Sequence, residues 1–442
     1  MRRAFLIACG AVALAAPSRA LAAAPTVTAT PAVGAAPLAV TLAAAGGTSG
    51  VYHWDLGDGT FADGPVVQHT YAAGQWVATV TVDGETATVV VRAEGVTLTA
   101  PARGRYGSPA AFSGAVVPAT PGESVTLQSP GGAVATTATA ADGSFRFRVG
   151  RLVSPGPFVA HTDVASSAPV DVLVRPRVTA SVVGTAFAGS RVVVTASLQP
   201  RAAGTLRVRV YDDGRLVATR RGPGAVALRP AKAGAIRAAA SVAPSAGYVA
   251  ASADTSTIVL EPELAQGARG ASVRVLEQRL AAMHYALRGI DGLYGDDTME
   301  AVLAFQKVHG LARTGTVDRS LWLRILHGAT PLARDPHGNH VEVDKTRQVL
   351  FEVRGGKVVL VVHVSTGATG NTPVGTWHVY RRVTGFDWVL YYPTYFLRGF
   401  AIHGYPDVPA YPASHGCVRV PMWIAQRLYA MDVYGDTVIV YP

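Results

Sequence analysis

Alternation between apolar and polar positions dominates the chain as far as Glu261. Apolar and polar residues alternate in short runs such as VATVTV (77–82) and TATVVV (86–91). Gly, Pro and Asp interrupt these runs. A period of two bounded by such residues predicts the strands of antiparallel sandwiches. The runs recur in three blocks, and we expect β-sandwiches over residues 25–94, 95–175 and 176–261. Alternatively, the last two blocks are halves of a single larger sandwich.

The apolar period lengthens after Glu261 to that of a helix. Val273, Leu276 and Leu280 lie at i, i+3 and i+7, and Asp297 with Glu300 predicts a capping box that opens a second helix. A third short helix is expected over 321–326. Residues 262–328 are therefore predicted to form a three-helix module.

Strand-like patterns return over residues 335–442. A hairpin is expected at Arg354-Gly355-Gly356-Lys357, a helix after Pro421, and a closing strand over 437–441. The fold class is therefore multidomain and mainly β: N-terminal β-sandwiches, a small three-helix bundle and a β-rich C-terminal domain. At 442 residues, the chain is too long for a single core.

The first 24 residues have the pattern of a secretory signal. Two arginines precede a short apolar run and a small-residue segment, so we expect export by the Sec route or, given Arg2-Arg3, by the twin-arginine route. Cys9 falls before the apolar run is complete; we expect it to be removed with the signal, with lipidation as the open alternative. No later stretch is long and apolar enough to predict a membrane helix.

The formal net charge of +10 favours an anionic partner. Because arginines are scattered along strand-like segments rather than clustered, we expect no nucleic acid, and an anionic cell-wall polymer is the alternative. The pattern predicts no cofactor and no metal site, and gives no indication of the oligomeric state.

The chemistry concentrates in the segment AIHGYPDVPAYPASHGCVRV (401–420). Cys417 is the only cysteine beyond the first ten residues, and an exported chain with a lone thiol is unusual unless its reactivity is used. An imidazole can accept the thiol proton, and either His403 or His415 is a candidate. A buried, unreactive cysteine with two hydrogen-bonded histidines is the structural alternative.

This segment resembles the active-site signature of the YkuD-type L,D-transpeptidases, in which His-Gly precedes Ser/Thr-His-Gly-Cys-x-Arg/Asn. The segment Thr372-Pro373-Val374-Gly375-Thr376-Trp377 and the strand HVEVDKTRQVLFEV (340–353) are similar to further parts of that family. Residues 264–326 resemble a three-helix peptidoglycan-binding domain. Residues 52–74, with Trp54 and Gly57-Asp58-Gly59, resemble a PKD-type immunoglobulin-like domain, and the two following blocks are expected to be Ig-like.

The resemblance implies a catalytic set and a set of substrate contacts. Cys417 attacks an amide carbonyl, His403 takes its proton, the Gly404 carbonyl orients the imidazole, and N–H groups around Gly416 and Cys417 hold the oxyanion. A helix beginning after Pro421 is expected to lower the thiol pKa. The expected substrate-binding residues are Arg419, Ser414, Trp388 and Tyr392.

The implied function is L,D-transpeptidation, with 3→3 cross-links formed between peptidoglycan stem peptides through a cysteine thioester. Hydrolysis by L,D-carboxypeptidase action and a non-catalytic wall-binding adhesin or anchor stay open as alternatives. No Lys has Ser three positions before it and no His precedes Glu, which disfavours serine D,D-peptidases and HExxH zinc peptidases. The expected partners are stem peptides and glycan.

Overall fold

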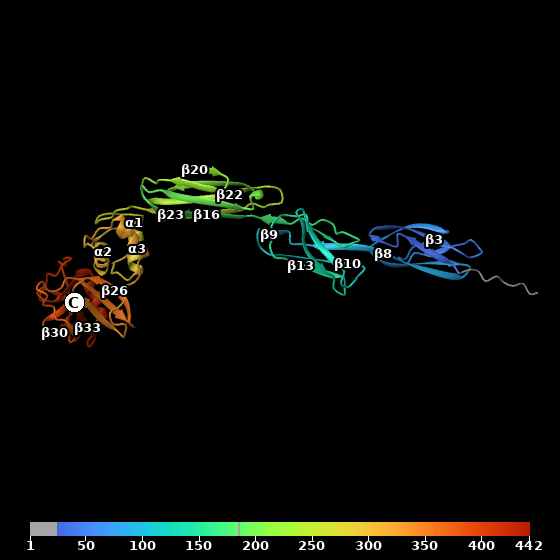
Figure 1. Cartoon of the computed structure of the whole chain (residues 1–442). Helices are drawn as coiled ribbons and strands as arrows, with labels where there is room; N and C mark the ends of the chain where they lie inside the picture. The colour runs from blue at the N-terminus through green and yellow to red at the C-terminus, as the bar shows by residue number, and fades with distance from the viewer. Residues whose placement is uncertain (1–23, 184–185) are drawn as a thin grey trace, which may run out of the picture. The chain divides into compact units, whose positions relative to one another are not determined.

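The computed structural model describes residues 24–183 and 186–442 (Figure 1). These residues divide into two compact units: residues up to Val178 with 198–206 and 241–252 form the first, and 179–197, 207–240 and 253–442 form the second. The proposed export signal and Cys9 lie outside the described residues. In the described part, no helix has both the length and the apolar character needed to cross a membrane.

The first sandwich is built around Trp54, which is almost fully buried and donates from Nε1 to the Gly64 carbonyl at 2.9 Å. The predicted turn is present, since Gly57 and Gly59 both have positive φ. One sheet has the order β1-β3-β6, and β4, β5 and β7 join β8 in the other. The strands are β1 (Thr26–Thr30), β2 (Val33–Ala35), β3 (Leu38–Ala45), β4 (His53–Asp55), β5 (Phe61–Asp63), β6 (Val66–Tyr71), β7 (Gly74–Val82) and β8 (Glu85–Thr99).

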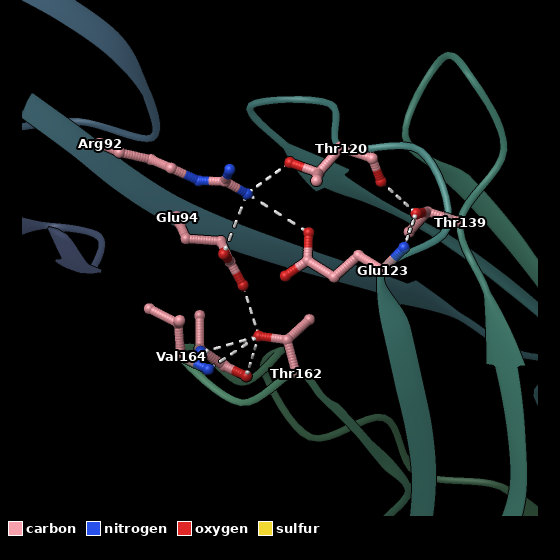
Figure 2. A network of polar contacts seen from close by, with 8 residues as sticks. Arg92, Glu94, Thr120, Glu123, Thr139, Thr162 and Val164 are labelled. Atoms are coloured by element: carbon pink, nitrogen blue, oxygen red, sulfur yellow. Dashed lines mark hydrogen bonds and ion pairs between the residues drawn. The ribbon is translucent and has the colours of Figure 1, made fainter. Parts of the chain in front are cut away.

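Strand β8 continues from the first sandwich into the second, where it pairs with β10 (Ala110–Val117). Figure 2 shows the polar network at this point: Arg92 reaches Glu94 at 3.4 Å and Glu123 at 3.3 Å, and the Thr162 hydroxyl donates to Glu94. Glu94 is almost fully buried, so these partners satisfy a carboxylate that would otherwise be costly to bury.

The strands of the second and third sandwiches lie in separate sheets. The second has β9 (Arg103–Arg105), β10, β11 (Ser124–Ser129), β12 (Gly132–Ala138), β13 (Ser144–Val149), β14 (Val159–His161) and β15 (Leu173–Arg175). The third has β16 (Arg177–Val183), β17 (Ala186–Phe187), β18 (Val192–Gln199), β19 (Gly204–Asp212), β20 (Arg215–Arg221), β21 (Gly224–Leu228), β22 (Gly234–Pro244) and β23 (Ser252–Leu260). The two sheets of the third sandwich have the strand orders β16-β18-β21 and β17-β23-β22-β19-β20.

The helical module has the three expected helices, α1 (Ala271–Ala282), α2 (Asp296–Val308) and α3 (Arg319–His327). The predicted capping box is wrong: α2 begins at Asp296 after Gly295, and no side chain caps it. The Asp297 carboxylate instead accepts from the Arg288 N–H at 2.9 Å, and Glu300 accepts from the Trp423 indole at 2.7 Å. Both side chains are thus committed to tertiary contacts that local sequence does not reveal.

The C-terminal domain places two sheets around an apolar core with one helix, α4 (Met422–Met431). The first sheet has the order β26-β25-β24-β33-β27 and the second β28-β30-β31-β32, with β29 on β30. The expected hairpin is present, because Arg354 pairs with Lys357 across two glycines of positive φ. The strands are β24 (His340–Asp344), β25 (Val349–Arg354), β26 (Lys357–His363), β27 (Gly375–His378), β28 (Arg381–Arg382), β29 (Phe386–Asp387), β30 (Leu390–Leu397), β31 (Phe400–Tyr405), β32 (Val418–Pro421) and β33 (Thr437–Tyr441).

The helical module and the C-terminal domain share one hydrophobic core. Leu276, Phe305 and Trp322 from the helices pack in the same buried cluster as Phe351 and Val361 of the sheet. The Ala286 N–H also donates to the Val361 carbonyl at 2.9 Å. The three helices therefore form part of the scaffold that supports the adjacent domain.

Candidate active site

Two neighbouring parallel strands bring the candidate residues together. In β31 and β32, Ile402 pairs with Val418 and His403 with Arg419. Ile402 and Val418 face the apolar core with α4. Because side chains alternate along a strand, His403 and Arg419 project to the opposite face. Cys417 lies in the bend that leads directly into β32, and the Arg419 charge acts on both His403 and Cys417.

His403 is held as a neutral base. Its ring is only 2% exposed, and Nδ1 lies 3.0 Å from the Gly404 carbonyl. That carbonyl can only accept, so Nδ1 carries the proton and Nε2 keeps its lone pair. Burial lowers the pKa of His403 to about 4, with the nearby Arg419 charge acting in the same direction. At neutral pH the imidazole is therefore uncharged and able to accept a proton.

Cys417 lies in the bend that leads into β32, and its thiol reaches the turn before β31. It is partly exposed, and Sγ donates to the Gly399 carbonyl at 3.6 Å. Burial raises the pKa of Cys417, outweighing the Ala401 N–H and the Arg419 charge, which both lower it. The expected lowering of the thiol pKa is wrong, because β32 separates Cys417 from the first turn of α4 and a helix terminus acts only over that range.

The nucleophile turn is closed by the buried Ser414 hydroxyl. This hydroxyl donates to the Cys417 carbonyl at 2.6 Å and accepts from the Gly416 N–H at 3.0 Å. Gly416 has φ 133°, and a Cβ there would lie 2.5 Å from the Phe400 ring, so a side chain at this position would have to displace that ring. Ser414 thus shapes the turn, and its hydroxyl has no free proton to offer a substrate.

A second loop, which precedes β27, fixes the same turn from outside. Asn371 donates from Nδ2 to the His415 carbonyl at 2.8 Å. The buried Thr372 hydroxyl donates to the Gly416 carbonyl at 2.7 Å and accepts from the Gly367 N–H at 2.9 Å. Sequence reasoning included Thr372 only as part of a motif and missed Asn371; the signal available was their place beside the Pro-x-Gly segment.

Comparison with known proteins shows which families the chain resembles. A family model for the L,D-transpeptidase catalytic domain (YkuD) matches residues 338–440, one for a peptidoglycan binding domain matches 269–325, and one for a PKD domain matches 22–95. A solved L,D-transpeptidase from Xylanimonas cellulosilytica is 34% identical over 97% of its chain and 40% of this one, with a TM-score of 0.39. The chain belongs to the YkuD-type L,D-transpeptidases. The family models and the sequence identity carry this assignment.

Other solved structures are more distant from this L,D-transpeptidase. A fused Zn-dependent amidase/peptidase/peptidoglycan-binding protein from Clostridium acetobutylicum is 19% identical over 40% of this chain and 99% of its own, with a TM-score of 0.22. Fibronectin(III)-like modules of Clostridium thermocellum CbhA are 18% identical over 37% and 93%, with a TM-score of 0.16. Comparison with curated proteins gives no match.

Residues 406–413 of the L,D-transpeptidase domain form a loop between His403 and Cys417. Side chains from other segments bind the carbonyl groups of this loop. The Val408 carbonyl accepts from His363 Nε2 at 2.7 Å, and the Tyr411 carbonyl accepts from the Ser365 hydroxyl at 2.7 Å. Arg313, which belongs to the helical module, donates to the Ala410 carbonyl at 2.7 Å. The carbonyl groups of the loop are thus held by side chains from other segments, which the loop's own sequence does not reveal.

The His363 anchor leads back to Lys307 of α2, which is 1% exposed. Lys307 Nζ lies 2.6 Å from His363 Nδ1, and 3.0 and 2.9 Å from the Gln348 and Val364 carbonyls. Burial lowers the pKa of Lys307 to about 6 and that of His363 to about 3. Yet the three acceptors match the three N–H donors of an ammonium group, so we assign Lys307 as charged and His363 as neutral.

The remaining expected site residues lie in varied surroundings. Arg419 packs its guanidinium 4.0 Å from the Tyr405 ring centroid. The His415 side chain is exposed. Trp388 is 88% exposed between β29 and β30. The Tyr392 ring packs edge-on against Tyr391 and Tyr429, so these contacts hold it within the domain.

Proposed function

We propose that the C-terminal domain forms 3→3 cross-links between peptidoglycan stem peptides through a thioester on Cys417. The single observation that carries this proposal is the position of His403, which has a free Nε2 lone pair, on the strand paired with β32, the strand that directly follows the partly exposed Cys417. His415 is the weaker candidate for the base because its side chain is exposed and has no fixed partner in the described residues.

The reaction begins with a neutral thiol and a neutral imidazole. Cys417 Sγ attacks the carbonyl carbon between the third stem residue and the terminal D-alanine while His403 takes the thiol proton. The C–N bond then breaks, His403 returns the proton to the leaving amine, and D-alanine departs. The side-chain amine of a second stem attacks the thioester, forms the new amide and releases the thiol.

The Cys417 N–H is the donor that we assign to the oxyanion. The Gly416 N–H, also expected to contribute, is used within the turn by the Ser414 hydroxyl. A preorganised main-chain donor of this kind contributes roughly 10²–10³ in rate. Gly416 therefore supports the site through its conformation, and Gly404 through the carbonyl that orients His403.

Arg419 is the group that we assign to a stem-peptide carboxylate. Within the described residues its guanidinium forms no ion pair, and its charge acts on the nearby Cys417 thiol. Trp388, which is largely exposed beside this sheet, is a candidate wall for the substrate, whereas the packed Tyr392 ring is a weaker one. The peptidoglycan-binding module would hold the domain near its polymer and raise the local substrate concentration.

Product analysis separates transfer from hydrolysis. The full chain is incubated with purified disaccharide-tetrapeptide, and products are identified by mass spectrometry. A dimer that has lost one D-alanine supports cross-linking, whereas a tripeptide monomer alone indicates carboxypeptidase action. If neither product forms, or if Cys417→Ala yields the same products, the enzymatic proposal fails and the anchor alternative gains.

A further inference from the structure

A second concave site lies far from the catalytic residues in sequence, and residues of both the second and the third sandwich line it. It is a pocket of about 470 Å³ lined by twelve residues, none of them acidic. All twelve belong to the first compact unit. Four of them are arginines: Arg105, Arg151, Arg175 and Arg177.

Two of these arginines face each other across a strand pair. In the parallel pairing of β9 with β15, Arg105 lies directly opposite Arg175. Like charges at directly opposed positions destabilise a sheet. Arg177 follows Arg175 by two residues, after the buried Pro176, and both line the pocket. Three positive charges therefore converge where the sheet alone would favour neutral or opposite partners.

The fourth arginine is fixed beside the same group. The Ser108 N–H donates to the Arg105 carbonyl at 3.1 Å, and Gly107 has φ 77°, which closes a turn after β9. Leu152 exchanges main-chain bonds with this turn, to the Ser108 carbonyl at 2.8 Å and from Gly107 at 2.9 Å. These bonds fix the main chain next to Arg151, which also lines the pocket.

None of these four guanidinium groups forms an ion pair with another group in the part of the chain that the structure describes. The contrast lies in the same unit, where Arg92 is neutralised by Glu94 and Glu123. Four exposed cations around one hollow repel each other and create a positive potential that attracts anions. Departures of this kind from ordinary charge pairing are typical of functional sites.

We propose that this pocket binds a polymer chain bearing phosphate or carboxylate groups. The planar guanidinium fork matches both oxyanions in bidentate geometry. The charges come from three separate segments around a pocket too large for one small ion, which favours a chain with several anionic groups. The Ser108 hydroxyl and the Gln199 amide, which also line the pocket, add neutral donors. The first compact unit thereby contacts an anionic polymer independently of the catalytic domain.

The test is calorimetric titration of the full chain with sodium polyphosphate and, separately, with poly-L-glutamate. The pocket variant is Arg105→Gln/Arg175→Gln, and the matched control is Arg146→Gln/Arg148→Gln on β13, where both arginines are exposed and outside the pocket. We expect the pocket variant to lose at least tenfold in affinity and the control less than twofold. The pocket variant should also unfold at the same or a higher temperature, because it loses a like-charge pair.

The two titrants distinguish the sources of the anion. Tighter binding of polyphosphate assigns a phosphate-bearing chain, and tighter binding of polyglutamate a carboxylate-bearing one. Equal losses in both variants would mean that net charge alone attracts the polymer, which overturns the proposal. Failure of the unaltered chain to bind either titrant at about 0.15 M salt overturns it as well.

Discussion

At the residue level, the charge states of His403 and Cys417 decide how the reaction starts. Burial lowers the His403 pKa to about 4 and raises that of Cys417, so the resting pair at neutral pH is an imidazole and a thiol. The proton then moves during attack and not before it. This differs from a preformed thiolate–imidazolium pair, in which the thiol pKa is depressed.

This difference predicts the pH dependence of thiol alkylation. The rate of Cys417 modification by iodoacetamide should be low below pH 7 and rise about tenfold per pH unit towards alkaline pH, because only the thiolate reacts. Intact-mass kinetics between pH 5 and 9 measure it. Appreciable modification at pH 6 would show instead that the thiol is ionised at rest.

A second prediction at this scale concerns Thr372. Thr372→Val removes the hydroxyl that bonds the Gly416 carbonyl and the Gly367 N–H, leaving buried main-chain groups unsatisfied. We expect a loss of about 1–3 kcal/mol in stability and a kcat reduced by about tenfold or more. The exposed Thr376→Val on β27 serves as the control. Equal kinetics in the two variants would contradict this role.

At the level of elements, the local sequence pattern predicted the features that depend on neighbouring residues alone. The strand alternation, the helices α1 to α3, the Gly355-Gly356 hairpin and α4 after Pro421 all follow from apolar spacing and turn residues. The hydrogen bonds that support the site do not follow from local pattern, because they join distant segments. Asn371 binds His415, and Glu300 binds Trp423 across 123 positions. The capping box failed for the same reason.

The contact chain from α2 to the active-site loop carries an element-scale prediction. Lys307→Met removes the donor to His363, whose other nitrogen holds the Val408 carbonyl. We expect kcat to fall about tenfold with a smaller change in KM, because the loop between base and nucleophile loses an anchor while the outer substrate contacts remain.

Steady-state kinetics with the full chain test this, and Lys357→Met in the exposed hairpin is the control. If Lys307→Met and Lys357→Met have the same kcat, the helical module supports only the fold and not the reaction.

At the scale of the whole molecule, a buried acid pair links stability to pH. Burial raises the pKa of Asp432, after α4, to about 7 and raises that of Glu352 on β25. The folded state therefore retains a proton that the unfolded chain releases above its ordinary carboxyl pKa of about 4. Stability from this pair is present below pH 4 and is lost as pH rises to about 7.

Asp432→Asn should remove part of this pH dependence. Between pH 5 and pH 8 the free energy of unfolding of the unaltered chain should fall by on the order of 2 kcal/mol more than that of the variant. Denaturant unfolding followed by tryptophan fluorescence measures the difference. Parallel curves for both proteins would show that the pair is ionised in the folded state.

The arrangement of the whole chain joins a catalytic domain to a module that shares its core, and three sandwiches precede them. The family assignment gives the class of enzyme, and the proposed chemistry depends on a covalent bond to Cys417 Sγ. Intact mass spectrometry of the full chain after brief exposure to a tetrapeptide muropeptide tests that bond most directly. We predict an acyl adduct of the stem minus D-alanine that maps to Cys417 and is absent in Cys417→Ala. An adduct on another residue, or turnover by the alanine variant, would contradict the account.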